Sequence, residues 1–561
     1  MGANRMKEII RNLVRDALTR VLGPTQQEFL ELEAQSTEVS RSKDERFGDY
    51  STNVALVLAG PLGLKPRDLA ERITQNLWED PDLLSGFQIA GPGFINFSLA
   101  PAVWNNNLHT IHGQKEAYGS ASKKTGLRVL LEFVSANPTG PLHVGHGRGA
   151  AVGDSLARLL KTCGYDVDTE YYVNDSGNQM KILGRSLILR YREMLGDPIE
   201  FPEDHYRGGY MVDLARELQG TELGSVLEHS SEQDVLEQAS AYAGDRILEG
   251  IRQDLNYFGV TYDCYFRENQ LHQTGAISTT LDQLRLKGKT ELHEGAIWFT
   301  MDDQKDEKDR VLVRASGEPT YFAADAAYHL DKLQRGYGML IDVWGSDHHG
   351  YVPRVRAAVQ ALDYPADVLK VLLVQFVNLI KDGRKISMST RSGEFVTLRE
   401  VLQEVGPDAA RFFFLTKRCD SHLDFDLDLA KRQSKDNPVY YVQYAHARVS
   451  AIFRIAGERG IDVDMTDPDL TALSLTEEKR IMKYLADFPD MLAEAAEVLE
   501  PHRVTFYLMG LAELFHAYYH DNRVLTEDAT VKKARLFLVE AVRQVIANGL
   551  RILGVSAPSR M

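Results

Sequence analysis

The chain has 561 residues, of which 44% are hydrophobic and 26% charged, and its formal net charge is −16. These values are ordinary for a globular protein of several domains, and the acidic balance argues against nonspecific coating of nucleic acid. Three distant cysteines predict neither disulfides nor a structural zinc site. The sequence shows no signal peptide and no apolar run of membrane-spanning length, so we expect a cytoplasmic protein that contacts no membrane.

Residues 1–120 form the first predicted unit. Apolar residues at helical spacing precede Gly23-Pro24, and segment 87–99 predicts two strands around a Gly-Pro-Gly turn. A polar linker at residues 120–126 ends this part of the chain. We therefore expect a separate N-terminal α/β domain.

The second unit, residues 121–430, opens with a strand at 128–136, a helix at 147–164 and a strand at 166–173. This order predicts a βαβ unit, and hence an α/β domain with a parallel sheet. Residues from about 175 to 290 are acidic and helical in pattern, which we interpret as an insertion. Strand-like runs resume at 296–301, 310–315, 340–345 and 371–380.

The third unit, residues 431–561, has few glycines and long amphipathic patterns, which predict an all-α helical bundle. One apolar stripe of this bundle consists of Val439, Val442, His446, Val449, Phe453 and Ala456.

The stretch SANPTGPLHVGHGRG, residues 135–149, places His143 and His146 in a turn rich in glycine and proline. Its glycines formally fit a dinucleotide-binding fingerprint, but about ten residues separate them from the preceding strand, so hydride transfer is disfavoured. A turn that enters a helix presents free N–H groups and a positive dipole end, which suit phosphate. We expect both histidines to donate hydrogen bonds to phosphate oxygens; the alternative is that they cap the helix or fill the core.

The string PLHVGHGR resembles the HIGH signature of class I aminoacyl-tRNA synthetases, and the longer EFVSANPTGPLHVGHGRGA resembles its arginyl-tRNA synthetase form. The resemblance implies a Rossmann-like class I catalytic domain, an additional N-terminal domain at the tRNA elbow, and an anticodon-binding bundle. It also implies the reaction: L-arginine is activated with ATP and Mg²⁺, and the arginyl group passes to the 3′-terminal adenosine of tRNA(Arg). The products are AMP, pyrophosphate and arginyl-tRNA.

The resemblance assigns nucleotide contacts to the histidine turn, to WGSDHHGY at 344–351 and to a second signature loop. A metal cluster at 347–349 is a disfavoured alternative, since adjacent histidines rarely reach one ion together. The implied ATP-binding residues are Pro141, Leu142, His143, Val144, Gly145, His146, Gly345, Asp347, His348, Met388 and Ser389.

The second signature loop, KMSKS in the family, aligns with residues 387–391, SMSTR, so both lysines are replaced. It lies between the strand run 371–380 and a helix capped by Thr397-x-x-Glu400. The cation for pyrophosphate is then expected from Arg391, Lys385 or Lys381. The alternative is a merely basic surface loop. Our catalytic set is His143, His146, Lys385 and Arg391.

Glu132 lies within an apolar strand, where a carboxylate needs a partner. Tyr321 and Asp325 are four residues apart on a predicted helix, and Asp325 can accept two parallel N–H bonds from a guanidinium. Taken alone, these residues would form an internal salt bridge and an ordinary helix surface pair. The resemblance assigns arginine binding to Glu132, Ser135, Asn137, His146, Tyr321, Asp325 and His349.

Tyrosines cluster among polar residues in the last unit, at 439–448 and 516–525. Unpaired bases stack on such rings, although we expect about half of them to face the core. The resemblance assigns anticodon contacts to Tyr441, Tyr444, Tyr519 and Met561. A monomer is expected, with tRNA(Arg), L-arginine and ATP as partners and no metal held by the chain. Two rival functions stay open: a catalytically inactive RNA-binding relative, and a class I synthetase for another amino acid.

Overall fold

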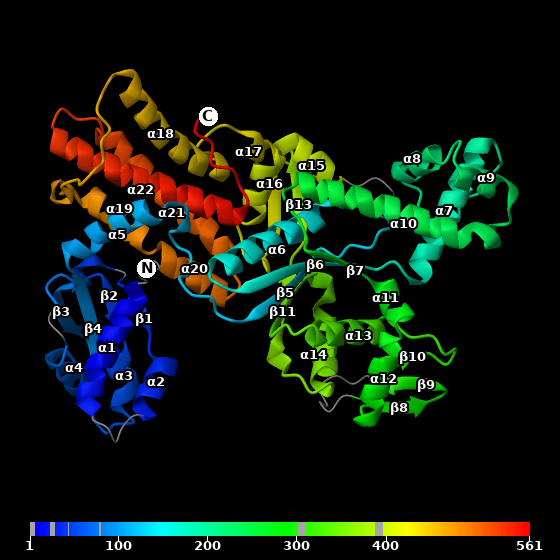
Figure 1. The fold of residues 1–561 in the computed structure, drawn as a ribbon, viewed down its shortest axis with the longest axis horizontal. Coiled ribbons are helices and arrows are strands. Elements are labelled where there is room, and N and C mark those ends of the chain that lie inside the picture. The colour runs from blue at the N-terminus through cyan, green and yellow to red at the C-terminus, as the bar shows by residue number, and fades with distance from the viewer. Residues whose placement is uncertain (1–5, 23–27, 43, 78–79, 301–309, 387–395) are drawn as a thin grey trace.

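The computed structural model describes residues 6–22, 28–42, 44–77, 80–300, 310–386 and 396–561. The molecule is elongated, with the N-terminal domain and the C-terminal helices towards one end and a helical insertion at the other (Figure 1). The catalytic sheet lies between them. Among the described residues, no helix combines the length and the apolar character that crossing a bilayer requires.

The N-terminal domain packs four helices on an antiparallel sheet, as the sequence predicts. The helices are α1 (Met6–Leu22), α2 (Glu28–Ser36), α3 (Val54–Ala59) and α4 (Pro66–Gln75). The sheet order is β1 (Val39–Arg41), β2 (Tyr50–Thr52), β4 (Phe94–Leu99) and β3 (Leu84–Ala90). The predicted turn between the last two strands is confirmed, and Gly91 (φ +53°) supplies a left-handed backbone conformation in it.

The catalytic domain is built on a five-stranded parallel sheet. Its order is β12 (Leu369–Val374), β11 (Met339–Gly345), β5 (Arg128–Phe133), β6 (Asp166–Val173) and β7 (Cys264–Arg267). Helix α6 (Val144–Thr162) connects β5 to β6, which confirms the predicted βαβ unit. Strand order reverses between β5 and β11, and ligands of such sheets bind at the carboxyl ends of the strands at that point.

The predicted insertion at 175–290 requires a correction. Helices α7 (Gly177–Leu195), α8 (Gly209–Glu217), α9 (Glu222–His229) and α10 (Glu232–Tyr257) do project from the sheet. The chain then returns to the sheet as β7, a strand of four residues that is too short to show an alternating pattern. Beyond α11 (Glu268–Gln273) and α12 (Ala276–Leu286), three strands form a separate antiparallel sheet: β8 (Thr290–His293), β9 (Ala296–Phe299) and β10 (Arg310–Val313).

The predicted strand at 371–380 is also wrong, because the apolar run divides between two sheets. Its first half is β12, and its second half is β13 (Val377–Lys381), which pairs with β14 (Arg384–Ile386) and β15 (Leu423–Asp426). At the break, the Gln375 carbonyl accepts a hydrogen bond of 2.9 Å from Arg148, and the Gln375 amide donates to Cys419. The run is mostly apolar on both sides of Gln375, so its pattern does not show that the chain changes sheets there.

Helices α13 (Tyr321–Gln334), α14 (Val352–Ala361), α15 (Leu398–Val405), α16 (Pro407–Phe414) and α17 (Leu427–Lys431) complete the catalytic domain. The bundle consists of α18 (Pro438–Glu458), α19 (Thr476–Ala486), α20 (Phe488–Glu497), α21 (His502–Asp521) and α22 (Ala529–Leu553). Five of the six residues of the predicted stripe are buried in α18, and Phe453 is partly buried.

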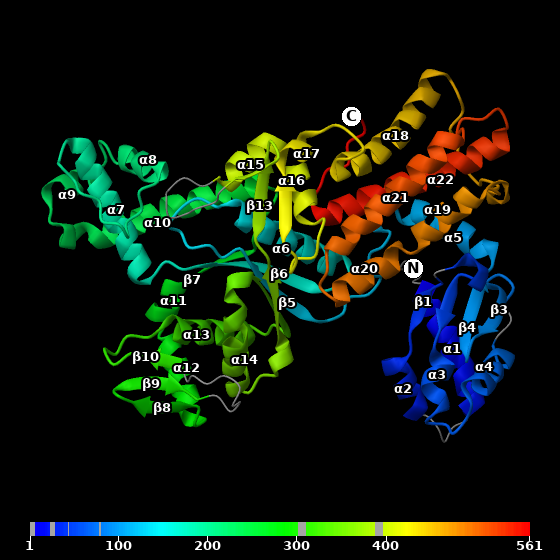
Figure 2. The same ribbon diagram turned by 180° about the vertical axis from the view of Figure 1, so that it is seen from behind.

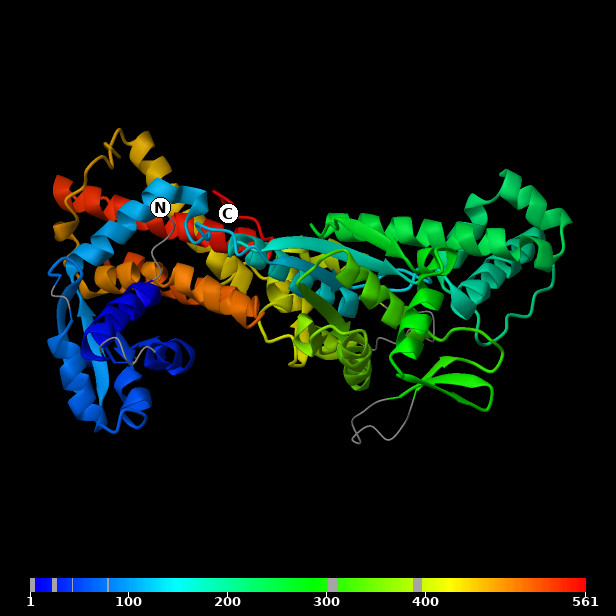
Figure 3. The ribbon, with the colours of Figure 1, turned by 60° about the horizontal axis from the view of Figure 1, so that its bottom comes forward.

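The N-terminal domain is attached to the bundle rather than to the catalytic domain. Helix α5 (Pro101–Gln114) packs against α19 and α22, and the Tyr118 hydroxyl donates to the Leu485 carbonyl over 2.9 Å. Arg41 and Lys7 form ion pairs with Asp487 and Glu494 of the bundle. Figures 2 and 3 show from behind and from below that the N-terminal domain lies beside the bundle and away from the catalytic sheet.

Candidate active site

A pocket of about 190 Å³ lies at the carboxyl ends of β5 and β11, where the strand order reverses. Its walls come from both strands, from the loop after β5, from β6 and α13, and from the short helix η4 (Ser346–Tyr351). The lining residues are Glu132, Val134, Ser135, Tyr172, Asp325, Tyr328, His329, Val343, Trp344, Gly345, His348 and Tyr351. Three predicted arginine-binding residues, Glu132, Ser135 and Asp325, therefore share one pocket.

The two histidines of the signature turn cap helix α6. His143 is the N-cap residue, and its Nδ1 accepts hydrogen bonds from the amides of Gly145 (3.1 Å) and His146 (3.4 Å). The Nδ1 atom of His146 in turn accepts from the amide of His143 over 3.2 Å. The rings stack with centroids 3.7 Å apart. The capping alternative is thus confirmed, and these amides, expected to be free for phosphate, are bonded within the turn.

Capping fixes where each imidazole carries its proton. A ring nitrogen that accepts a hydrogen bond carries no proton, so each neutral ring holds its proton on Nε2. Burial lowers the pKa of His146 to about 3 and also lowers the pKa of His143. Both rings are therefore neutral at pH 7, and each has an Nε2–H that can donate to an acidic ligand. Leu142 and Val144 beside them are fully buried and belong to the core under the turn.

The WGSDHHGY segment lies against this turn. A side chain at Gly345 would meet Oδ1 of Asp347 at 2.4 Å, so the Asp347 carboxylate folds over a bare backbone position. The charge of Asp347 acts on His143, partly opposing the effect of burial on its pKa. His348 lines the pocket beside Trp344, whereas His349 is exposed and is not among the lining residues.

Glu132 is held by a hydroxyl and an ammonium group. Its Oε1 accepts from Ser135 Oγ over 2.8 Å, and its Oε2 lies 2.6 Å from Lys332 Nζ. Val134 and Ser135 have φ values of +68° and +43°, a strained conformation that turns the chain back on the strand end. The internal ion pair that the sequence left open for Glu132 is confirmed, and the residue also faces the pocket.

Lys332 connects Glu132 to a second buried carboxylate. Its Nζ lies 2.9 Å from Asp342 Oδ1, and His329 Nε2 lies 2.9 Å from Asp342 Oδ2. Glu132 and Asp342 face each other across β5 and β11, and Lys332 is fully buried. Burial disfavours all these charges, but the two carboxylates raise the pKa of Lys332, and Lys332 with His329 lowers that of Asp342.

Asp325, one turn before His329, is partly buried, and the loss of solvent around its carboxylate raises its pKa to about 6; a hydrogen bond from Tyr351 and the nearby His329 act against this rise. Tyr321, at the start of the same helix, is 51% exposed and lies outside the pocket lining. Its hydroxyl nevertheless lies close to Gly177: a Cβ atom added to that glycine would be 3.5 Å from it. Asn137 donates to Gln179 Oε1 over 2.7 Å, which ties the signature turn to α7.

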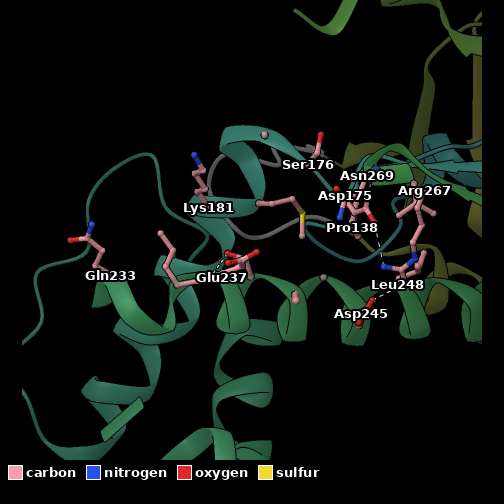
Figure 4. A pocket seen from close by; sticks show the side chains of 17 residues that line it. Pro138, Asp175, Ser176, Lys181, Gln233, Glu237, Asp245, Leu248, Arg267 and Asn269 are labelled. Carbon is pink, nitrogen blue, oxygen red and sulfur yellow. Dashed lines mark hydrogen bonds and ion pairs between the residues drawn. The ribbon is translucent and has the colours of Figure 1, made fainter. Parts of the chain in front are cut away.

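A larger cavity of about 460 Å³ lies behind the segment Asp175–Gly177, between α7 and α10. Figure 4 shows Arg267 between Asp175 and Asp245, to which it donates hydrogen bonds of 3.3 and 2.7 Å. On the other side of this segment, Glu268 accepts from Ser176 and from the Tyr172 hydroxyl. The segment is therefore a wall of the larger cavity that these hydrogen bonds hold in place.

The second signature loop is described in part. Met388, Ser389 and Arg391 lie outside the described residues. Lys385, on exposed β14, lies 3.8 Å from Asp424, and Lys381 lies 2.8 Å from Glu404. The predicted capping box is confirmed: Thr397 Oγ1 accepts from the Glu400 amide, and the Glu400 carboxylate accepts from the Thr397 amide. The Leu398 amide donates to the Leu142 carbonyl, which joins this helix to the histidine turn.

The predicted RNA-binding tyrosines gather on the bundle around a residue that sequence reasoning missed. Arg448 lies 4.5 Å from the ring centre of Tyr444 and 5.0 Å from that of Tyr519. Tyr441, Arg448 and Tyr519 line a hollow of about 640 Å³ between α18 and α21. Tyr518 instead is buried, with its hydroxyl on Glu478. Met561 is 52% exposed, at the end of a tail that His446 bonds through the Pro558 carbonyl.

Sequence reasoning missed several polar and aromatic residues of the pocket lining, among them Tyr172, His329, Trp344 and Tyr351, and it missed Lys332 and Asp342, which hold Glu132 and His329 from outside the lining. A lysine on the apolar face of α13, one turn after Tyr328, is the signal that could have revealed Lys332.

Comparison with known proteins agrees with this geometry over the whole chain. Residues 107–418 match the family "tRNA synthetases class I (R), catalytic domain", residues 8–99 the "Arginyl tRNA synthetase N terminal domain" and residues 442–561 the "DALR anticodon binding domain". An arginine–tRNA ligase of Desulfosudis oleivorans is 50% identical, over 99% of this chain and 100% of the relative.

Solved structures give the same result. A crystal structure described as a putative arginyl-tRNA synthetase of Campylobacter jejuni is 36% identical, with a TM-score of 0.75, over 82% of this chain and 99% of that one. The Thermus thermophilus arginyl-tRNA synthetase has the same fold, with a TM-score of 0.77 at 23% identity over 99% and 100% of the two chains.

The parallel sheet, the histidine turn at its switch point and the catalytic-domain match define a class I aminoacyl-tRNA synthetase. Its architecture is the predicted one, with an α/β domain before the catalytic domain and a helical anticodon-binding domain after it. Within that class, the chain belongs to the arginyl-tRNA synthetase family. It is an arginine–tRNA ligase whose substrates are arginine, ATP and tRNA(Arg).

Proposed function

We propose that the pocket between β5 and β11 binds the arginine substrate, with Asp325 as the acceptor for its guanidinium. The supporting observation is that two carboxylates share the pocket but differ in their partners: Glu132 is paired with Lys332, whereas Asp325 has a neutral hydroxyl partner. A carboxylate without a cation partner is the strongest acceptor for a forked, always charged donor.

We assign the remaining predicted contacts by position. Tyr321 covers the guanidinium from the rim of the pocket, and Glu132, Ser135, Asn137 and His146 bind the amino and carboxylate end of arginine beside the signature turn. His349, the predicted arginine contact, is not among the residues that line the pocket. Its neighbour His348 lines the pocket instead. A pocket built around a buried acceptor rejects an amino acid that lacks the matching donors by roughly 10⁴–10⁵.

We propose that His143 and His146 donate from Nε2 to phosphate oxygens of ATP, since Nδ1 of each ring is occupied by the cap. Asp347 and Gly345 bind the ribose and the flat side of the nucleotide. The arginine carboxylate oxygen forms the new bond to the α-phosphorus, and the bond from that phosphorus to pyrophosphate breaks. The neutral histidines stabilise charge that develops on the phosphate oxygens, and no protein nucleophile is required.

The leaving pyrophosphate requires cations. We propose Lys385 and Arg391 for this role rather than Lys381, because Lys381 lies 2.8 Å from Glu404, whereas Lys385 lies 3.8 Å from Asp424. Mg²⁺ would neutralise the phosphates, held chiefly by their own oxygens, since the described residues gather no group of three metal-type side chains.

We propose that Tyr441, Tyr444, Tyr519 and Met561 contact the anticodon, and that the N-terminal domain contacts the tRNA elbow. The proposed domain limits are 1–120, 121–430 and 431–561. We further propose that the chain acts in the cytoplasm as a monomer, which light scattering of the purified protein at working concentration tests.

The test of the arginine pocket is arginine-dependent pyrophosphate exchange, measured with and without tRNA(Arg). The unchanged chain should exchange in the presence of tRNA, and Asp325→Asn should lose kcat/KM for arginine by about 10²-fold or more, because the neutral amide cannot pair with the guanidinium. The KM for ATP should stay within about twofold. If Asp325→Asn leaves the KM for arginine unchanged, the guanidinium lies elsewhere.

A further inference from the structure

A hydroxyl from a different element holds the carboxylate that we assign to the guanidinium. Tyr351, the last residue of η4, donates its hydroxyl proton to Asp325 Oδ2 on α13. Among the described residues, no other hydrogen-bond donor contacts the Asp325 carboxylate. Tyr351 is also part of WGSDHHGY, in which Gly345 and Asp347 are assigned to the nucleotide.

The ring of Tyr351 is fixed on more than one side. It packs edge-on against Phe322 of α13, with centroids 6.2 Å apart, and lies 6.1 Å from Trp344 of β11. The hydroxyl therefore projects from a packed ring rather than from a mobile side chain. Both Trp344 and Tyr351 line the pocket, so the contact with Asp325 is made at the pocket wall.

A lone carboxylate is a poor template for a planar donor, because rotation about its last side-chain bond is broad and costs little. Bidentate pairing with a guanidinium requires both oxygens to lie in the plane of the fork. A hydrogen bond to one oxygen from a packed ring restricts this rotation. The oxygen that accepts from Tyr351 still has a second lone pair for an N–H group.

We propose that Tyr351 is a positioning residue for arginine: its hydroxyl orients the Asp325 carboxylate for a planar, forked donor. This inference rests on the proposed contact between Asp325 and the guanidinium. It gives the WGSDHHGY segment two roles, since Asp347 in its middle serves the nucleotide and Tyr351 at its end serves the amino acid.

The proposal has a consequence for pH dependence. The charged groups that act on Asp325 are His329 on its own helix, Glu132 from β5 and Glu268 from α11, together with the Tyr351 hydroxyl from η4. Burial raises the pKa of Asp325, and the bond from Tyr351 opposes that rise. Removing the hydroxyl should therefore raise this pKa further, so that the carboxylate becomes protonated, and arginine binding weakens, at a higher pH than in the unchanged protein.

The experiment replaces Tyr351 with phenylalanine, which keeps the ring and removes the hydroxyl. We expect Tyr351→Phe to raise the KM for arginine about tenfold, the usual effect of one hydrogen bond to a charged group. We expect kcat and the KM for ATP to stay within about twofold. The KM for arginine should begin to rise at a higher pH than in the unchanged protein. Tyr364→Phe, which removes a hydroxyl at the edge of the same core, is the matched control and should change none of these.

A double-mutant cycle separates positioning from a general structural effect. If Tyr351 acts through Asp325, adding Tyr351→Phe to Asp325→Asn should cost less than about twofold more. Equal, additive losses in the two backgrounds would overturn the proposal, as would a rise in the KM for ATP equal to that for arginine. A large effect of Asp325→Asn with none of Tyr351→Phe would overturn the positioning role alone. No effect of Asp325→Asn would instead overturn the underlying function of Asp325.

Discussion

The proposed arginine pocket and the proposed anticodon-binding surface of the bundle differ in how their charged groups are partnered. Behind the pocket wall, buried charges are paired with one another: Lys332 lies between Glu132 and Asp342, and each distance is below 3 Å. On the bundle, partly exposed rings surround Arg448, and the contacts are stacking and cation–π contacts rather than ion pairs. A network whose charges are already paired in the folded protein suits a small substrate of fixed shape, whereas flat, partly exposed rings suit unpaired bases.

The strongest test of this difference is to remove the buried cation, Lys332. Lys332→Met leaves Glu132 and Asp342 facing each other in the sheet core without their shared partner. We expect a loss of about 3–5 kcal/mol in the free energy of unfolding, because removing one member of a buried ion pair leaves an uncompensated charge. Chemical denaturation measures it. Lys123→Met, in the exposed linker, is the control, and an equally small effect of both substitutions would refute the role of Lys332.

On the bundle, a comparable truncation should weaken binding rather than folding. Arg448→Ala removes the cation that lies over the rings of Tyr444 and Tyr519. We expect the affinity for tRNA(Arg) to fall by about 1–3 kcal/mol, the usual size of such stacking contributions, while the KM for arginine is unchanged. Arg454→Ala, on the same helix but paired with Glu458, is the control. Filter binding of labelled tRNA measures the difference, and equal behaviour of the two variants would contradict the assignment.

The two regions should also differ in their response to pH. The pKa of Asp325 is about 6, above its usual value, and the guanidinium binds its ionised form. The KM for arginine should therefore be constant above pH 7 and rise by up to about tenfold per pH unit as the pH falls below 6. Steady-state kinetics from pH 5 to 8 measures it, with the KM for tRNA as the comparison. A KM for arginine that stays flat down to pH 5 would show that Asp325 is not the acceptor.

The smallest effect concerns the helix that joins the second signature loop to the histidine turn. Thr397→Ala removes the capping hydroxyl of α15 and should cost about 1 kcal/mol of stability. Thr397→Ser keeps the hydroxyl and should restore most of it. Thermal unfolding of the unchanged protein and the two variants measures their order of stability. If the alanine and serine variants are equally stable, the cap is not a stabilising contact.

Much of the fold could be predicted because its signals are local. The helix after the signature turn, the hairpin at Gly91 and the capping box at Thr397 each depend on residues within a few positions of one another. The errors have the opposite origin. Strand β7 is too short for a pattern, and the run 371–380 is mostly apolar on both sides of Gln375 although it enters two sheets.

Within the site, the sequence indicated which side chains carry the chemistry but not how they are paired. His143 and His146 were expected to contact phosphate, and the capping bonds that set their tautomers appear in the folded turn. Glu132 was expected to need a partner, but Lys332 lies 200 residues away in the chain. Tyr351 belongs to a recognised string, and its bond to Asp325 depends on how η4 packs against α13.

By itself, the sequence determined the family and the order of the domains, because motifs and periodicities are written in neighbouring residues. The tertiary structure decided which charges neutralise one another and which carboxylate stays without a cation. The physical reason is that these pairings depend on the register of β5 against β11 and on the seating of α13 across them, where burial makes each missing partner costly.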